Sequence, residues 1–424
     1  MVKNIYVCIW LTFLSAQAFA QNQVEALRYS QSLPGSTARS SGSGGAFGAV
    51  GADFSSALIN PAGLAFYRSK QFGIGTSFYN ITNKADYITN STTDNKFNFN
   101  IPNISFVNSY INYENGQEVK DGWVNVCYGI TLNRTNNFHR QTLYEGNNNR
   151  SSITQNFAER GNGQDFNNFS PSSLEYLALQ TKAIDFNTTD TNQYVSGFKS
   201  PALDINQTGS IRTRGAMNDY AFSIAGNYSH KIYIGGSLFI SSVRYIEDND
   251  FKETDNKPAS SKDIKSISLN QYIKTNGTGL GARIGIIGKL NENIRIAYSF
   301  QSPVSHTLKD IYSYQIDATF DPGASYNSGP AVSPATSKSQ QNNYSYRIST
   351  PSRNTLSIAL LDKKIGFLSG DVEFVNYKQA KLSPVVQGDN FNDDNKLIKT
   401  IYKNAVNLRV GAEIISDIFR FRAG

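Results

Sequence analysis

The chain has 424 residues, of which 39% are hydrophobic, and its mean hydropathy is −0.39. Because no apolar run reaches the roughly 18 residues that a membrane helix needs, the sequence excludes a helical membrane protein. Three His and two Cys leave almost no material for a metal cluster, a disulfide framework or histidine-based catalysis, so we expect no cofactor. The net charge of +7 is moderate and selects no partner by itself.

Residues 1–20 have the organisation of a secretory signal peptide. Lys3 supplies the positive start, an apolar stretch of about ten residues follows, and the segment ends on Ala18-Phe19-Ala20. This pattern predicts export of the chain and cleavage before Gln21.

Residues 21–68 do not alternate like a strand. The segment is rich in Gly, Ser and Ala, and Asn60-Pro61-Ala62 follows its glycines. Those glycines are Gly42, Gly44, Gly45, Gly48 and Gly51. Small residues let backbone pack closely, and Pro61 fixes a turn while it removes a hydrogen-bond donor. Because the segment is compact and nearly uncharged, we predict that it forms a plug, or hatch, inside a barrel.

From residue 71 onward the hydrophobic period is two. In 123–133 the large apolar residues stand at even positions, with Asn, Cys, Gly and Thr between them. The same alternation recurs in 220–229, 294–301 and 406–414. This period predicts strands with one large apolar face and one small or polar face.

The lengths of the connections decide between two all-β architectures. We predict strands at 71–80, 100–112, 122–133, 218–229, 231–246, 265–289, 293–317, 342–361, 364–378 and 402–414, with another beginning at 418. Short connections around 112–122, 230, 290–292, 362–363 and 415–417 alternate with long ones at 81–99, 134–217, 247–263, 318–341 and 379–401. A Greek-key sandwich has no reason to sort its loops by size, whereas outer-membrane barrels have short turns on one side and long loops on the other. Residues 69–424 therefore predict an all-β, transmembrane, antiparallel up-and-down β-barrel.

In such a barrel the apolar face meets lipid and the small or polar face lines the interior. Six charged residues are expected to point inward. They are Arg283, Arg295, Arg409, Asp371, Glu373 and Glu413. One interpretation is that they bind a ligand head group or hold the plug. The other, which we favour from sequence alone, is that they are ordinary solvated residues of the lumen.

The number of strands predicted up to the C-terminal end of the sequence does not fit a complete barrel. Ten strands and a fragment at 419–424 do not give the even strand number of bacterial single-chain barrels. We therefore expect that several C-terminal strands follow this sequence, in a number that it does not reveal.

Two features of the strands and loops have alternative interpretations. The connection 134–217 contains a predicted helix over 174–184, begun by Ser172 or Ser173. Its apolar side would either receive a hydrophobic ligand or pack against neighbouring loops. Pro303 and Pro351 interrupt two long strands, because Pro donates no ladder hydrogen bond. They mark either a kink in the wall or the place where the strands leave the membrane.

Five segments of the sequence carry a family resemblance, namely 26–30 (ALRYS), 44–49 (GGAFGA), 55–64 with its NPA motif, 346–351 (YRISTP) and 371–377 (DVEFVNY). In these segments the sequence resembles the FadL/TodX group of outer-membrane transporters for hydrophobic compounds. The resemblance implies a barrel of about 14 strands, plugged by an N-terminal hatch to which Asn60, Pro61 and Ala62 belong. It also implies that molecules such as long-chain fatty acids are caught at the outer loops and passed toward a lateral opening in the wall. No motif places the ligand-contacting residues.

Three functions are weighed from the sequence. The first is passive uptake of hydrophobic small molecules across the outer membrane of a Gram-negative bacterium, by a monomer in contact with outer-membrane lipid and lipopolysaccharide. The second is a hatch-bearing barrel that binds or shuttles secreted proteins, as in type IX secretion. The third, an outer-membrane phospholipase, needs a Ser–His pair that His139, His230 and His306 do not offer, so we expect no enzyme. Scattered basic residues also argue against nucleic acid as a partner.

Overall fold

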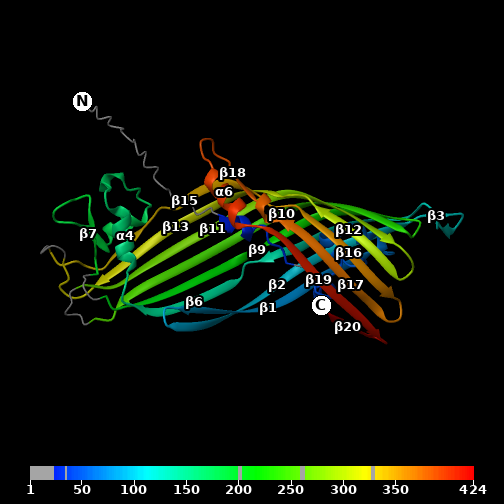
Figure 1. The fold of residues 1–424 in the computed structure, drawn as a ribbon, viewed down its shortest axis with the longest axis horizontal. Coiled ribbons are helices and arrows are strands. Elements are labelled where there is room, and N and C mark those ends of the chain that lie inside the picture. The colour runs from blue at the N-terminus through cyan, green and yellow to red at the C-terminus, as the bar shows by residue number, and fades with distance from the viewer. Residues whose placement is uncertain (1–22, 34–35, 199–202, 258–262, 326–329) are drawn as a thin grey trace, which may run out of the picture.

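The computed structural model describes residues 23–33, 36–198, 203–257, 263–325 and 330–424, so the predicted signal peptide 1–20 lies outside the described residues. One antiparallel sheet of 16 strands dominates the fold (Figure 1). Neighbouring strands follow one another in the chain, so the predicted all-β, up-and-down fold is confirmed. Among the described residues, no helix is long and apolar enough to cross a membrane.

Eleven strands follow one another along the main path of the sheet. They are β1 (Gln71–Tyr87), β2 (Asn90–Ile111), β5 (Trp123–Asn137), β9 (Ile205–Tyr228), β10 (Ile232–Asp255), β11 (Ile264–Lys289), β12 (Ile294–Gln301), β16 (Arg353–Asp362), β17 (Gly366–Asn376), β19 (Asn404–Ser416) and β20 (Phe419–Ala423). Five further strands pair with these or with one another beyond breaks in the path, namely β6 (Arg140–Asn148), β13 (Ser305–Phe320), β14 (Ala335–Lys338), β15 (Asn342–Ser349) and β18 (Lys381–Pro384). Among the described residues, β1 and β20 are not paired with each other.

The remaining elements are short. Two separate hairpins are formed by β3 (Tyr113–Glu114) with β4 (Gln117–Glu118) and by β7 (Ile184–Phe186) with β8 (Tyr194–Ser196). The helices are α1 (Gln23–Arg28), α2 (Ala38–Gly42), α3 (Ser56–Ile59), η1 (Pro61–Phe66), α4 (Ile153–Gly161), η2 (Phe166–Asn168), α5 (Leu174–Gln180), η4 (Tyr377–Gln379) and α6 (Asn392–Ile401).

The sheet curves around the N-terminal segment, by which we mean the described residues between 23 and 68. Phe54 lies against Gly73 of β1, Pro61 lies against Gly235 of β10, and backbone at Ser43 lies against Gly411 of β19. These strands are far apart in the strand order, yet one short segment contacts all of them. The face of the sheet that it contacts is therefore concave, and we call it the inner face.

The core of this part of the molecule lies between the segment and the inner face. Phe47, Val50 and Leu64 of the segment form one buried cluster with Val107 of β2 and Ile287 of β11, among others. A fully buried Phe or Leu side chain contributes about 2 kcal/mol through removal from water. The segment is thus attached by ordinary core packing as well as by the polar contacts described below.

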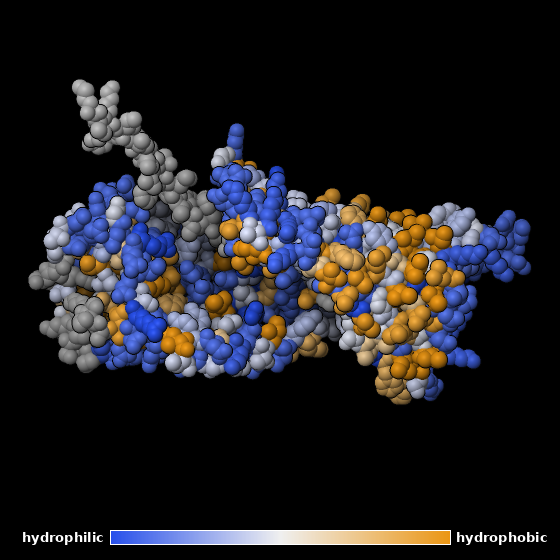
Figure 2. Space-filling model, viewed as in Figure 1, coloured by the Kyte–Doolittle hydropathy of each residue, from blue (hydrophilic) through white to orange (hydrophobic). Residues whose placement is uncertain are grey.

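The outer face of the sheet is apolar over one part of its length. On β10, Ile232, Leu238 and Ile240 point outward and are 42–64% exposed, whereas Ser242 and Arg244 follow at the same parity. Other strands carry matching exposed residues, including Phe72, Ile74, Phe222, Ile224, Leu280, Ile284, Ile296, Leu356, Ile358, Leu368, Phe374, Leu408 and Val410. Together they form a band, seen as the orange part of the molecule in Figure 2. About nine tilted strand residues, the length of this stretch on β10, are enough to cross a bilayer.

The strands continue well beyond the apolar band, so two predicted loops are wrong over much of their length. A third, 134–217, is wrong at both ends, because β5 and β6 occupy its start and β9 already begins at Ile205. Residues 81–99 form the paired ends of β1 and β2, with tight pairing up to Tyr87 and Asn90. Residues 247–255 likewise belong to β10, which pairs with β11 from Thr254 to Ile232 along its length. The outer face no longer meets hydrocarbon here, so the sequence no longer shows apolar residues at every second position. The backbone hydrogen bonds between the strands continue all the same.

A small cap domain lies at the end of the sheet with the long connections, which we call the long-loop end (Figure 1). It contains α4, α5, β7 and β8, and its core includes Phe157 and Leu177 together with Ile264 of β11 and Ile316 of β13. Ser173 caps α5 by accepting a hydrogen bond from the Tyr176 amide at 3.2 Å, so the predicted helix is confirmed.

The helix is shorter than expected, and its apolar side is not free. It ends at Gln180 rather than near 184, because Lys182 adopts a φ of 56° in the left-handed region. Leu177 and Ala178 are buried in the cap domain. Of the two interpretations of this helix, packing against neighbouring loops is the one that the structure supports.

Both predicted proline interruptions are present. β12 ends before Pro303 and β13 begins after it, and Pro351 separates β15 from β16 in the same way. The two breaks lie side by side, since the Val304 amide donates to Thr350 Oγ1 at 3.0 Å and the Thr350 amide donates to the Val304 carbonyl at 2.9 Å. Exposed side chains change from apolar to polar across the breaks, which therefore lie at the rim of the apolar band.

Candidate functional site

The Asn60-Pro61-Ala62 turn lies at the centre of the N-terminal segment. Asn60 stands between α3, which ends at Ile59, and η1, which begins at Pro61, where a missing N–H costs no helical hydrogen bond. Asn60 is buried; its Oδ1 accepts from the Ala62 amide at 3.1 Å and its Nδ2 donates to the Gly48 carbonyl at 2.8 Å. The Asn60 side chain thus joins two parts of the segment. Its role in a hatch stays a prediction.

The turn packs directly on glycines of the inner face. A Cβ atom added at Gly235 would lie 2.5 Å from the Ala62 amide nitrogen, and one at Gly285 would lie 1.9 Å from Asn60 Oδ1. Both distances are far below van der Waals contact, so the close approach of the segment to β10 and β11 requires glycine at these positions.

Two of the charged residues predicted to point inward bind the backbone of the segment. Asp371 Oδ2 on β17 accepts hydrogen bonds from the amides of Phe47 and Gly48 at 3.1 and 3.2 Å. Arg295 on β12 donates from Nη1 to the Val50 carbonyl at 2.5 Å. These strands therefore hold the segment by polar contacts that do not depend on its side chains.

Glu413 on β19 joins the segment to the last strands of the sheet. Its carboxylate pairs with Arg39 of α2 at 3.1 Å and with Arg422 of β20 at 2.6 Å. One carboxylate thus bridges an arginine of the segment and an arginine of the wall.

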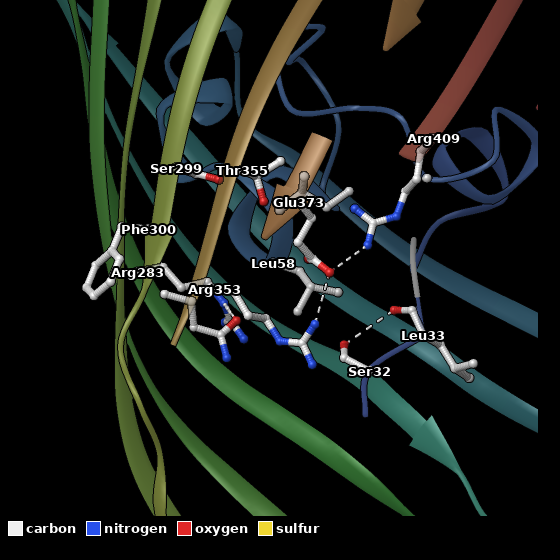
Figure 3. A pocket seen from close by; sticks show the side chains of 13 residues that line it. Ser32, Leu33, Leu58, Arg283, Ser299, Phe300, Arg353, Thr355, Glu373 and Arg409 are labelled. Atoms are coloured by element: carbon white, nitrogen blue, oxygen red, sulfur yellow. Dashed lines mark hydrogen bonds and ion pairs between the residues drawn. The ribbon is translucent and has the colours of Figure 1, made fainter. Parts of the chain in front are cut away.

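The other three predicted residues form two ion-pair groups within the wall. Arg283 on β11 pairs with Asp219 on β9, and both side chains are almost fully buried. Glu373 on β17 pairs with Arg353 and with Arg409, each at 3.1 Å (Figure 3). Solvation, the interpretation favoured from sequence, does not describe these residues: their charges are buried and paired.

Arg283 and the group of Glu373, Arg353 and Arg409 line a small polar cavity between the segment and the wall (Figure 3). Its volume is about 50 Å³, and Ser32 and Leu58 of the segment close one side of it. A second cavity of about 30 Å³ adjoins it, with His306 in its lining together with Val304 and Thr350 of the two strand breaks. The cavities are sized for a few atoms, so in this state the segment fills the interior at this level.

A larger pocket opens on the other side of α1, toward the long-loop end. It has a volume of about 270 Å³ and lies between α1 and the inner face of β10, β11 and β13. Its apolar and aromatic lining comes from Ile273, Tyr272, Tyr312 and Tyr314, and its ionisable lining from Arg28, Glu25 and Glu247. This combination suits a small molecule with a hydrophobic part and a polar end.

A buried carboxyl group fixes α1 to the wall beside this pocket. The Tyr346 hydroxyl donates to Glu25 Oε2 at 2.7 Å, and Asp310 lies 3.4 Å from the same hydroxyl. Burial, with the charge of Asp310 as the second cause, raises the pKa of Glu25 to about 8, although Arg28 opposes the shift. Outward side chains of β13 and β15 near this site are polar, so the group lies beyond the apolar band.

We expect the docking of α1 to weaken as the pH rises. The pKa of Glu25 is raised in the folded state, so its stabilising effect is complete below about pH 4.5 and is lost as the pH approaches about 8. The size of the effect is at most about 5 kcal/mol. Hydrogen exchange of the α1 amides, measured from pH 5 to 8.5, should show faster opening at higher pH than the intrinsic exchange chemistry explains.

Glu25→Gln should flatten this pH dependence, because the amide cannot ionise. Glu114→Gln, at an exposed glutamate of β3, serves as the control and should keep the wild-type dependence. An unchanged pH profile in Glu25→Gln would contradict the assignment of the effect to this carboxyl group.

Several important residues of this interface were not among those expected from the sequence. Asp219 and Arg353 stand at the inner parity of their strands, so extending the period-two pattern by one or two residues would have found them. Tyr346 lies in a segment that carries the family resemblance and Glu25 directly precedes another, but nothing in the sequence joins them to each other. His306 is buried, and its inward parity was readable from β13.

A scan against protein-family models found no match, and no curated protein matches the sequence. Among solved structures, the chain is similar to the toluene transporter TodX of Pseudomonas putida, at 12% identity over 93% of this chain and 83% of TodX, with a TM-score of 0.44. It is also similar to the toluene transporter TbuX of Ralstonia pickettii (13% identity, 92% and 87% coverage, TM-score 0.43) and to the monoaromatic hydrocarbon channel CymD (11%, 91% and 81%, 0.40). Because each of these TM-scores is below 0.5, the similarity carries no argument about function.

Proposed function

We propose that this protein is an outer-membrane channel through which hydrophobic small molecules enter by passive diffusion, with the N-terminal segment as its hatch. The observation that carries the proposal is the band of exposed Ile, Leu, Val and Phe side chains around a sheet whose interior the segment fills. Exposure of so large an apolar surface to water is unfavourable, whereas contact of the same surface with the hydrocarbon of a bilayer is not.

The finer parts of the proposal follow from this placement. Residues 1–20 direct export to the outer membrane of a Gram-negative bacterium, residues 69–424 belong to the barrel, and the protein acts as a monomer. Transport needs no energy source, because removal of apolar surface from water drives the ligand into the protein. Long-chain fatty acids are the substrate class that the sequence resemblance favours.

We place ligand capture in the pocket of about 270 Å³ above α1. From there the path leads past α1 to the paired strand breaks at Pro303 and Pro351, whose residues Val304 and Thr350 line an interior cavity. In the present state hydrogen bonds between Val304 and Thr350 close the breaks. Since the breaks lie at the rim of the apolar band, their opening would release a hydrophobic molecule toward the membrane rather than into water.

Interior dimensions favour small molecules over the alternative of protein cargo. The cavities described above have volumes of about 50, 30 and 270 Å³, which suit small ligands and not a polypeptide segment.

Uptake of labelled oleate and labelled toluene into cells, with and without the protein, tests the proposal. We expect the protein to accelerate uptake of at least one of the two while leaving uptake of a sugar of similar size unchanged. No acceleration for any hydrophobic probe, together with loss of a secreted protein on deletion of the gene, would favour the protein-handling alternative instead.

A further inference from the structure

The segment between β17 and β19 forms a distinct surface at the rim of the apolar band. It contains η4, β18 and α6, and it leaves β17 just after the exposed Phe374 and enters β19 just before the exposed Val406. We call this surface, residues 377–403, the rim segment. It lies between the apolar band and the cap domain along the long axis of the molecule (Figure 1).

The rim segment is firmly attached on one side. Ile398 of α6 is fully buried, and Asn395 both accepts from the Leu382 amide and donates to the Leu382 carbonyl, each at 2.9 Å. The Tyr402 hydroxyl donates to the Gln23 carbonyl at 2.7 Å, which ties the segment to α1. The conformation of α6 is thus fixed by the protein, and its other side is free to meet something else.

The free side combines apolar and positive groups. Leu397 and Ile401 are 45% and 50% exposed and stand four residues apart, so they share one face of α6. Five exposed lysines lie on the rim segment, namely Lys378, Lys381, Lys396, Lys399 and Lys403. With Asp389, Asp393 and Asp394, they leave the segment a net positive charge of +2 (five lysines less three aspartates). Within the part of the chain that the structure describes, Lys396 alone of the five forms an ion pair, with Asp393 at 3.0 Å.

We propose that the rim segment binds a phosphorylated glycolipid of the outer leaflet, with its phosphates on the lysines and its acyl chains against Leu397 and Ile401. The proposal rests on the membrane placement given under the proposed function. Its apolar residues continue the lipid-facing band, and its lysines lie where head groups begin. Lysine binds phosphate as a point charge, and a basic amphipathic helix at a membrane surface gains affinity from both contributions. Figure 2 shows the segment as a largely hydrophilic area with apolar spots beside the orange band.

Binding of labelled lipid A with both phosphates, measured with the detergent-purified full-length protein, tests this site. Dephosphorylated lipid A and phosphatidylcholine are the comparison lipids. We expect wild-type protein to bind the phosphorylated form at least tenfold more tightly than either, with an affinity that falls as salt is added.

The variant Lys399→Gln/Lys403→Gln should bind phosphorylated lipid A about tenfold more weakly, since each basic residue near an anionic lipid surface contributes substantially to binding. Lys363→Gln/Lys364→Gln removes two exposed lysines from the short turn between β16 and β17 and should bind like wild type. Lys378→Gln/Lys381→Gln provides a second pair on the rim segment with the same expected loss.

Heat-dependent gel mobility reports whether each variant is folded, so a folding defect is recognised independently of binding. Equal binding of phosphorylated lipid A by wild type and both rim variants would overturn the proposal, as would equal binding of the dephosphorylated lipid. If instead the wild-type protein fails to insert into any lipid, the proposed function itself is wrong.

Discussion

Gly235→Val should loosen the N-terminal segment and open the barrel to polar solutes. Any Cβ at this position would lie 2.5 Å from backbone atoms of Pro61 and Ala62, and backbone cannot rotate out of the way as a side chain can. Overpacking of this kind costs about 3 kcal/mol. We expect a lower melting temperature in detergent and faster swelling of liposomes in a small sugar.

The adjacent Gly236 offers a matched control. It points to the outer face, where the nearest atom to an added Cβ is the Arg283 carbonyl oxygen at 3.7 Å. Gly236→Val should therefore keep wild-type melting and permeability. If the two variants behaved alike, the inward packing of the segment on β10 would be refuted.

Asp219→Ala should destabilise the protein more than any exposed substitution. It removes the partner of Arg283, whose guanidinium is almost completely buried and also stacks on Phe239 at 3.8 Å. Leaving one member of a buried ion pair without its partner costs about 3–5 kcal/mol. Urea denaturation of the purified protein in detergent should show this loss as a lower midpoint.

A second substitution separates the charge effect from lost packing. The double variant Asp219→Ala/Arg283→Met has no unpaired buried charge at this site, so much of the stability should return. Asp393→Ala, which breaks the exposed pair with Lys396, should leave the midpoint nearly unchanged. A double variant as unstable as the sum of its single variants would contradict the explanation by an unpaired charge.

The strands of the wall could be predicted from the sequence where their outer face meets hydrocarbon, because there apolar and small or polar residues must alternate. Exposed Leu238 and Ile240 alternate with buried Phe239 and Ser241, and this alternation is enough to place a strand and to orient its faces. Above the apolar band the outer face meets polar surroundings, the pattern disappears, and the extension of β1 to Tyr87 was mistaken for a loop.

The interior was predicted only in part, because parity gives the face of a residue and not its partner. Asp371 was expected to point inward, but its contact with the Gly48 amide joins residues 323 positions apart, and no local rule connects them. The same holds for Glu25 and Tyr346. Residues that the sequence suggested were solvated in the lumen, such as Asp371, Arg295 and Glu413, are instead bonded to the N-terminal segment.

Nitroxide spin labels placed one at a time along β10, with the protein in lipid bilayers, would show most directly which surface meets hydrocarbon. Labels at Leu238 and Ile240 should be accessible to oxygen and shielded from a water-soluble nickel complex, and a label at Arg244 should show the reverse. Labels at Leu238 that meet the nickel complex, or that no small molecule reaches because protein covers them, would contradict a membrane-embedded barrel.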